Sequence, residues 1–326
     1  MLDPLIKEIL SCSELQAWPD LENILAKRKP GTIALFKIAY ESTANTQIEA
    51  LAIEAAIVCF IINCILIDDV LDKDEKGIWQ TYGAGRVANL AAALQARQQT
   101  LIHQSSFSDH QKQEVMFHLN QMKLKEARAQ ELATRSPLDL NQYWDIVHGK
   151  SGNVCATAMQ LGGLLGGADQ SQIEVLYTIG KNLGEVGQIS NDLRGAFDES
   201  INPDWAMPGC SLPILIALTS QHAQLNALKQ HIDSGIHNTT ELKKVQDILL
   251  ESGAVSLCCD HIAQRLELMY EGLCQCTLDN KTHLIKNIGE DIQHAIAWVR
   301  DLDIELLKKT TQTLDTLHEK LAALEL

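Results

Sequence analysis

The apolar positions of this chain recur with the period of a helix. One face of a predicted helix, for example, collects Ile173, Leu176, Ile179 and Leu183. Proline is missing from 31–136 and from every position after 213, and these stretches are rich in Ala, Leu, Gln, Glu and Lys. Alternating β-branched runs with hairpin turns are missing as well. The pattern predicts an all-α protein, with breaks near 29–31, 76–85, 104–109, 135–138, 201–213 and 233–238.

The most apolar stretch, 50–67, is long enough to approach the threshold for a transmembrane helix. Glu54 and Asn63 interrupt it, however, and it runs directly into Asp68-Asp69. We therefore predict a central helix, buried on all sides, and no transmembrane segment. A leucine stripe over 301–326 predicts either a packing helix or a coiled-coil contact.

Composition narrows the class of protein. The chain has 326 residues, of which 46% are hydrophobic and 21% charged, so it can bury a large core and is not intrinsically disordered. Its net charge of −15 disfavours binding to nucleic acid or anionic lipid, and an anionic substrate would need metal ions or a cationic pocket. The nine cysteines and an N-terminus that does not resemble a signal peptide predict reduced thiols and a cytoplasmic protein.

A first acidic cluster follows the apolar stretch. Asp68 and Asp72 are four residues apart and Asp69 and Asp72 three, so a continuing helix would bring the carboxylates together at its C-terminal end. Like charges and the helix dipole both disfavour that placement, and a bound Mg²⁺ would reverse both effects. A solvated acidic helix end is an equally good interpretation of this cluster alone.

A second polar cluster lies about 120 residues later. Asn191, Gly195 and Glu199 are spaced four residues apart, which predicts one shared helical face, with Asp192 beside them and Gln188 one turn back. Oxygen ligands here could hold further Mg²⁺ on the far side of a diphosphate. The alternative is an ordinary helix terminus with Gly195 near its end.

Taken in order, these segments resemble the isoprenoid synthase type I family, which comprises trans-prenyl diphosphate synthases, class I terpene cyclases and related prenyltransferases. Asp68-Asp69-x-x-Asp72 matches the family's first aspartate-rich motif, and 188–192 resembles the Gln-x-x-Asp-Asp that opens the second. Three shorter segments have counterparts as well: Ala129-Gln130 for Gly-Gln, Lys150-Ser151-Gly152 for Lys-Thr-Gly, and Ser211-Leu212-Pro213 for Thr-Leu-Pro. The resemblance runs from about residue 26 to 220.

The departures from the family pattern fall on groups that hold isopentenyl diphosphate. The basic loop is reduced to Ala26-Lys27-Arg28-Lys29-Pro30, and no twin arginine follows the first motif. Ile61 stands where a histidine is expected, and the lysine expected before Thr-Leu-Pro is replaced within 207–210. The second motif drifts toward the cyclase pattern, with Gly195 in place of a hydroxyl residue. Without those groups, burial of a second diphosphate would be costly.

The resemblance implies a single large helical bundle around a central cavity, spanning 1–326, and roles for particular side chains. It implies a homodimeric, Mg²⁺-dependent transferase that ionises an allylic prenyl diphosphate. The departures from the family pattern predict that the prenyl group passes to an unknown acceptor other than plain isopentenyl diphosphate. Three Mg²⁺ ions are expected, with the metal ligands Asp68, Asp69, Asp72, Asn191, Asp192 and Glu199. The expected catalytic residues are Asp68, Asp72, Lys150 and Gln188, and the expected diphosphate-binding residues are Arg28, Lys29, Lys150 and Ser151.

Several alternatives stay open at this stage. A class I terpene cyclase is the second candidate, although only fifteen aromatic residues are present to line a carbocation cavity. A chain-elongating synthase or its non-catalytic partner subunit is the third. The block 68–74, followed by Trp79 and by 89–94, also resembles bacterial prenyltransferases that modify a tryptophan in a pheromone peptide. Asn63 and Cys64 are small, which leaves room for a long prenyl tail one turn before Asp68.

Overall fold

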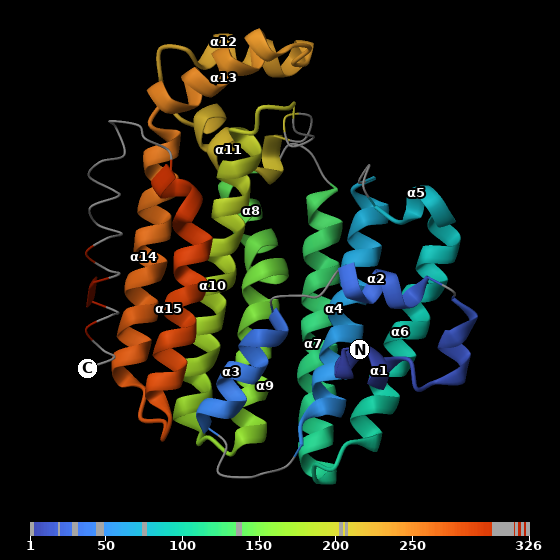
Figure 1. Ribbon diagram of the computed structural model, residues 1–326. Helices are drawn as coiled ribbons and strands as arrows, with labels where there is room; N and C mark the ends of the chain where they lie inside the picture. Colours follow the sequence, from blue (N-terminus) through green and yellow to red (C-terminus); the bar gives the residue numbers. More distant parts are fainter. Residues whose placement is uncertain are drawn as a thin grey trace. The chain divides into compact units, whose positions relative to one another are not determined.

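The computed structural model describes residues 3–18, 20–27, 32–43, 49–73, 77–134, 139–201, 205, 208–301, 316, 319–320 and 323. All regular elements in this part of the chain are helices, which confirms the predicted all-α class (Figure 1). The first half contains α1 (Pro4–Ile9), η1 (Ser13–Ala17), α2 (Leu21–Lys27), α3 (Thr32–Thr43), α4 (Leu51–Leu71), α5 (Trp79–Tyr82), α6 (Ala84–Gln104) and α7 (Asp109–Ala133). The second half contains α8 (Leu140–Val147), η2 (His148–Gly152), α9 (Asn153–Gly166), α10 (Gln170–Ala196), η4 (Pro208–Cys210), α11 (Leu212–Thr219), α12 (Leu225–Ser234), α13 (Thr239–Glu251), α14 (Ala254–Gln275) and α15 (Lys281–Asp301).

Most of the predicted breaks are confirmed. Helices end and begin at Leu71 and Trp79, at Gln104 and Asp109, and at Ser234 and Thr239. The predicted breaks at 29–31 and 135–138, and nearly all of the leucine stripe over 301–326, lie outside the described residues. Several other breaks were not predicted from the sequence. One lies between α9 and α10, where Gly167 adopts a φ of 90° that favours glycine, and others lie between α11 and α12, between α13 and α14, and between α14 and α15.

The chain separates into two compact units, each built from several stretches of sequence. The first comprises 1–127, 157–177 and 277–280, and the second comprises 128–156, 178–276 and 281–326. The prediction of one domain over 1–326 stays a prediction.

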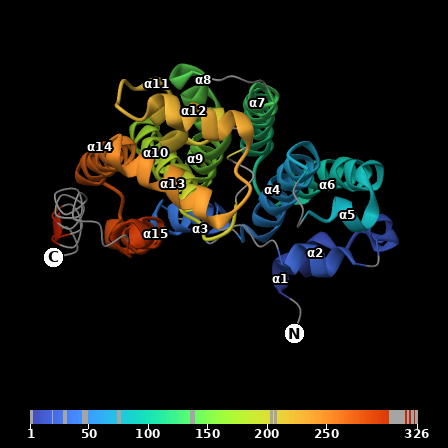
Figure 2. The same ribbon diagram turned by 90° about the horizontal axis from the view of Figure 1, so that it is seen from above.

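The first unit is organised around α4. This helix packs along α6 and is buried on nearly all sides between Ile53 and Cys64, because almost every residue in that stretch is apolar (Figures 1 and 2). By length and composition α4 could cross a membrane, but 67% of its most apolar window is buried within the chain. Buried Arg97 on α6 donates to the carbonyls of Glu8 and Ile9, at 2.7 and 3.1 Å, and so fixes α1 beside it.

The second unit is organised around the C-terminal half of α10. Figures 1 and 2 show α10, α14 and α15 running side by side, with α12 and α13 forming a short hairpin at one end of them. The chain around η2 packs against α10 at two glycines. A Cβ on Gly184 would lie 2.2 Å from the Ser151 carbonyl oxygen, and one on Gly180 would lie 2.6 Å from that of Cys155. Only glycine permits this approach, so η2 is held directly on the backbone of α10.

Candidate functional site

The first acidic cluster lies at the C-terminal end of α4, as predicted. Asp68 is half-buried, Asp69 is buried and Asp72 is exposed at the C-cap, where its amide donates to the Asp68 carbonyl oxygen at 2.8 Å. Lys73 then leaves the helix with a φ of 54°, in the left-handed region that ends helices. Helix geometry therefore keeps Asp68 and Asp72 one turn apart.

A partly buried ion pair on α7, beside Cys64, was not predicted from the sequence. Lys123 on α7 lies 2.9 Å from a carboxylate oxygen of Glu126, and its Nζ lies 3.5 Å from the Sγ of Cys64. Burial raises the pKa of Cys64 to about 12, so this thiol is neutral at physiological pH. Lys123 occupies part of the space beside Cys64 that the sequence argument had left for a prenyl tail.

In the second cluster, Asp192 is the centre of a hydrogen-bond network. One of its carboxylate oxygens accepts from the Tyr143 hydroxyl at 2.6 Å and from the Leu212 amide at 2.9 Å. The other accepts from the Gln188 side-chain amide at 2.8 Å. Asp192 is only 4% exposed, and its negative charge and the burial of the phenol raise the pKa of Tyr143 well above its usual value, burial contributing most. Asp192 thus joins α10 to α8 and to the start of α11, a structural role that the motif alone does not indicate.

The predicted helical face of Asn191, Gly195 and Glu199 is wrong for Glu199. Asn191 is exposed and Gly195 half-buried on the last turn of α10, but the helix ends at Ala196 and Glu199 lies in the bend that follows. The end is fixed by Gln246 of α13, whose amide donates to the carbonyl of Ala196 at 3.1 Å. The helix terminus therefore lies one residue after Gly195. Metal binding by Asn191, Asp192 and Glu199 stays a prediction.

The predicted diphosphate-binding residues Lys150 and Ser151 lie on η2, a π-helical turn between α8 and α9. Such turns place an extra residue in a helix and are frequent at functional sites. The Ser151 hydroxyl donates to the Gln188 side-chain oxygen at 2.7 Å, and Gln188 in turn donates to Asp192. The structure therefore brings together Ser151, Gln188 and Asp192, three of the residues singled out in the sequence.

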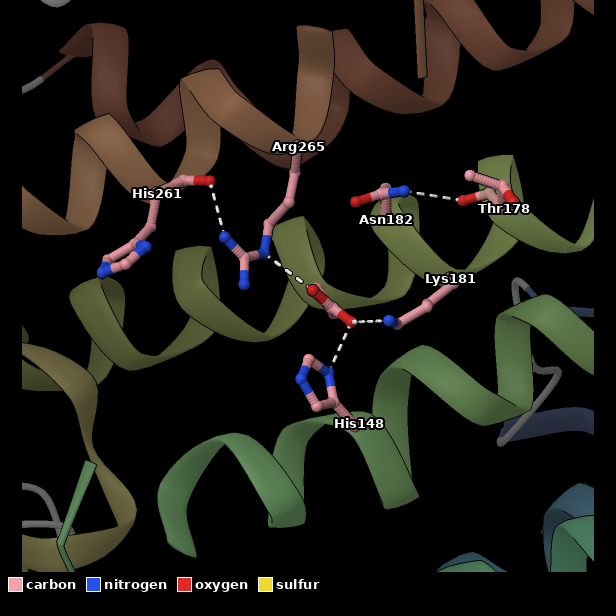
Figure 3. Close-up of polar contacts among 7 residues, drawn as sticks. His148, Thr178, Lys181, Asn182, His261 and Arg265 are labelled. Carbon is pink, nitrogen blue, oxygen red and sulfur yellow. Dashed lines mark hydrogen bonds and ion pairs between the residues drawn. The ribbon is translucent and has the colours of Figure 1, made fainter. Parts of the chain in front are cut away.

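A charged cluster beside η2 was also missed by sequence reasoning (Figure 3). Its centre is Glu185 on α10, whose carboxylate contacts His148 Nδ1 at 2.6 Å, Arg265 Nε at 2.8 Å and Lys181 Nζ at 3.8 Å. Arg265 also lies over the Trp144 ring, 4.2 Å from its centroid. Burial opposes ionisation of Glu185, yet the hydrogen bond with His148 and the charges of Arg265 and Lys181 hold the pKa of the carboxyl below its ordinary value. The partners come from α8–η2, α10 and α14, and this long-range pairing leaves no local signal in the sequence.

The remaining predicted cations, Arg28 and Lys29, lie outside the described residues. The donors that are described fit Mg²⁺, since the first cluster offers only carboxylate oxygens, at a helix end where anions are otherwise unfavourable. Within the described ranges, no three His, Cys, Asp or Glu side chains converge as a complete metal site. A cation that takes a few protein carboxylates and completes its shell with substrate phosphate suits such a donor set.

Comparison with solved structures shows the fold. The decaprenyl diphosphate synthase from Rhodobacter capsulatus superposes with a TM-score of 0.76 at 18% identity, covering 89% of this chain and 94% of that one. The geranylgeranyl pyrophosphate synthase from Lactobacillus brevis gives a TM-score of 0.74 at 20% identity, covering 90% and 94%.

Comparison of sequences shows the family. Dimethylallyltranstransferase of Mycobacterium tuberculosis is 31% identical over 113 residues, a stretch that spans 32% of this chain and only 35% of that relative. The polyprenyl synthetase family model matches residues 27–249, a range that contains both acidic clusters, η2 and the charged cluster's Glu185. With about two thirds of its length matched, this chain belongs to the polyprenyl synthetase family.

Proposed function

We propose that this protein ionises an allylic prenyl diphosphate in a Mg²⁺-dependent reaction and transfers the prenyl group to an acceptor other than plain isopentenyl diphosphate. The observation that carries the proposal is the family match over 27–249, which spans the aspartates at the end of α4 and the bonded series from Ser151 through Gln188 to Asp192. The donor chemistry of both clusters suits a diphosphate held through cations.

The residues of this chain would divide the work between cation and substrate. Asp68, Asp69 and Asp72 would hold Mg²⁺, which would neutralise the diphosphate and stabilise it as a leaving group. Lys150 would place a positive charge against the diphosphate. The Ser151 hydroxyl, which is held by Gln188, would lie beside that diphosphate. Expulsion of pyrophosphate breaks the allylic carbon–oxygen bond, and the acceptor then forms the new bond to the allylic cation.

We infer the nature of the acceptor from the positions that would be expected to hold a second diphosphate. Ile61, in place of the expected histidine, is an apolar residue buried within α4. Cys210, within the segment where a lysine is expected, is half-buried, and its thiol contacts the carbonyl of Ala133 at 3.5 Å. Neither position supplies a hydrogen-bond donor comparable with a histidine or a cation to a second anion, which supports an uncharged or differently charged acceptor.

We further propose that the protein is a homodimer in the cytoplasm. Phe117 and Leu124 lie seven residues apart on α7, and their exposed fractions are 56% and 66%. Large apolar side chains exposed along one helix favour contact with a second copy. The nine free cysteines are compatible with a reducing compartment.

The test is incubation of the purified protein with Mg²⁺ and allylic diphosphates of several lengths, with and without isopentenyl diphosphate, while released pyrophosphate and products are measured. Pyrophosphate release that requires a third molecule, such as an indole-containing peptide, supports the proposal. Longer prenyl diphosphates would overturn the acceptor argument, and cyclic hydrocarbons or terpene alcohols would indicate a cyclase instead. A chain that is silent alone and active only when mixed with a synthase would be a partner subunit.

A further inference from the structure

The cluster around Glu185 is well ordered by contacts, yet the reaction proposed above does not use it directly. The Glu185 side chain is 3% exposed, and both its carboxylate oxygens have cationic or potentially cationic partners, His148 on one and Arg265 on the other. A buried carboxylate persists as a charge only when such partners replace its hydration. Side chains from three elements, α10, η2 and α14, therefore meet at one buried carboxylate.

The contact with His148 falls on the first residue of η2, two residues before Lys150. At the other end of the turn, a Cβ on Gly152 would lie 3.2 Å from Cγ and 3.3 Å from Oε1 of Glu185. Glu185 thus touches both ends of the π-helical turn. Ser151, inside the turn, is fixed separately by Gln188, which lies three residues after Glu185 on the same face of α10.

The other partners hold the carboxylate in place. The Arg265 guanidinium donates to Glu185 through Nε and to the His261 carbonyl through Nη1, at 3.1 Å (Figure 3). It also lies over Trp144, and the Trp144 ring stacks on His148 with centroids 5.9 Å apart and an interplanar angle of 26°. Trp144 therefore contacts both His148 and Arg265, two of the three side chains that bind Glu185.

From these contacts we propose that Glu185 is a positioning residue: through His148 it fixes the π-helical turn so that Lys150 and Ser151 are presented to the diphosphate. This inference rests on the proposed function, since it concerns the same substrate group. A π turn can relax to an α turn by shifting one residue, which would rotate Lys150 about the helix axis. The His148–Glu185 bond opposes that shift, because it ties the first residue of the turn to α10.

Lys181 provides a matched control for His148. Both side chains are 41% exposed, and both contact the same carboxylate oxygen, but Lys181 lies on α10 itself and has no connection to η2 through this contact. His148 lies closer to that oxygen than Lys181, at 2.6 against 3.8 Å, so if Glu185 acted only as a charge to be neutralised, both substitutions would lower stability, H148A more than K181M, without a specific loss of diphosphate affinity. If it positions η2, only the loss of His148 should disturb diphosphate binding.

The test compares wild type with H148A, H148N and K181M in the full-length chain. The measurements are the Kd of inorganic pyrophosphate in Mg²⁺ by calorimetry, kcat and KM for pyrophosphate release, and hydrogen exchange of a peptide spanning 148–152. We expect H148A to weaken pyrophosphate binding and raise KM roughly tenfold, with a smaller change in kcat, and to speed exchange in that peptide. In H148N the side-chain amide can replace the Nδ1 donor, so most of the affinity should return, whereas K181M should match wild type.

Two results overturn the inference while leaving the proposed function intact: an active H148A with the Kd and exchange of wild type, or an equal loss of affinity in H148A and K181M. Thermal unfolding of each variant separates loss of fold from loss of position. A wild-type protein that neither binds pyrophosphate nor releases it from any prenyl diphosphate would overturn the proposed function itself, and with it this role for Glu185.

Discussion

The ends of α4 and α10 carry acidic side chains in very different surroundings. At the end of α4, Asp68 is half-buried and Asp72 is exposed, and both stand at the C-terminus of an apolar helix. At the end of α10, Asp192 is buried and accepts three hydrogen bonds from side-chain and backbone donors. The first arrangement lowers stability unless a cation binds, whereas the second supports the fold whether or not one does. Similar motifs can therefore carry unequal shares of binding and stability.

The largest effect that would test this contrast is expected at α4. The double substitution Asp68→Asn with Asp72→Asn should lower kcat/KM for pyrophosphate release by about a hundredfold or more, because the carboxylates that would hold Mg²⁺ are removed. The same substitutions should leave the free energy of unfolding unchanged or raise it by about 0.3–1 kcal/mol, because they remove anions from a helix C-terminus. A marked loss of stability measured by thermal unfolding would show that these aspartates are structural.

The converse result is expected at α10. Asp192→Ala should lower the free energy of unfolding by about 2–4 kcal/mol, because the Tyr143 hydroxyl and the Leu212 amide would lose their acceptor inside the core. Tyr143→Phe, which removes one donor and keeps the carboxylate, should cost only about 1 kcal/mol. Denaturant unfolding of both variants measures the difference, and equal small losses would contradict the assignment of Asp192 as a scaffold.

The smallest expected effect is on the pH dependence of the free energy of unfolding, to which two glutamates contribute with opposite signs. The lowered pKa of Glu185 means that its ionised form stabilises the folded state above the ordinary range of a glutamate, about pH 4, and that this contribution is lost as pH falls through the folded value. Burial raises the pKa of Glu54 on α4, so its ionised form destabilises the fold and protonation relieves the penalty.

Unfolding measured from pH 7 to 3 should separate these two cases. Glu185→Gln should lose stability at neutral pH and show a shallower decline toward acid than wild type. Glu54→Gln should gain a few tenths of a kcal/mol at neutral pH, and that gain should fade in acid. Parallel curves for the two variants would show that the cations around Glu185 do not stabilise its charge.

The sequence was sufficient to predict the helical class, the core helix α4 and the first acidic cluster, because all three follow from local periodicity and composition. It was insufficient where a side chain far away in the sequence determines the local structure. The end of α10 is fixed by Gln246, some fifty residues later, so the position of Glu199 outside the helix could not be read from its spacing. Glu185 and Arg265 are eighty residues apart in the sequence, so their pairing could not be predicted for the same reason.

The glycine contacts between α10 and the chain around η2 have a consequence for how this protein tolerates change. At Gly180 and Gly184 backbone meets backbone with no side chain between, so the distance separating these segments cannot be adjusted by repacking as it could at a leucine or valine seam. Substitutions in the surrounding core would therefore change the side chains near these segments, while the spacing between the two segments stayed constant. If this segment holds the diphosphate as proposed, new acceptors would be accommodated without the loss of that contact.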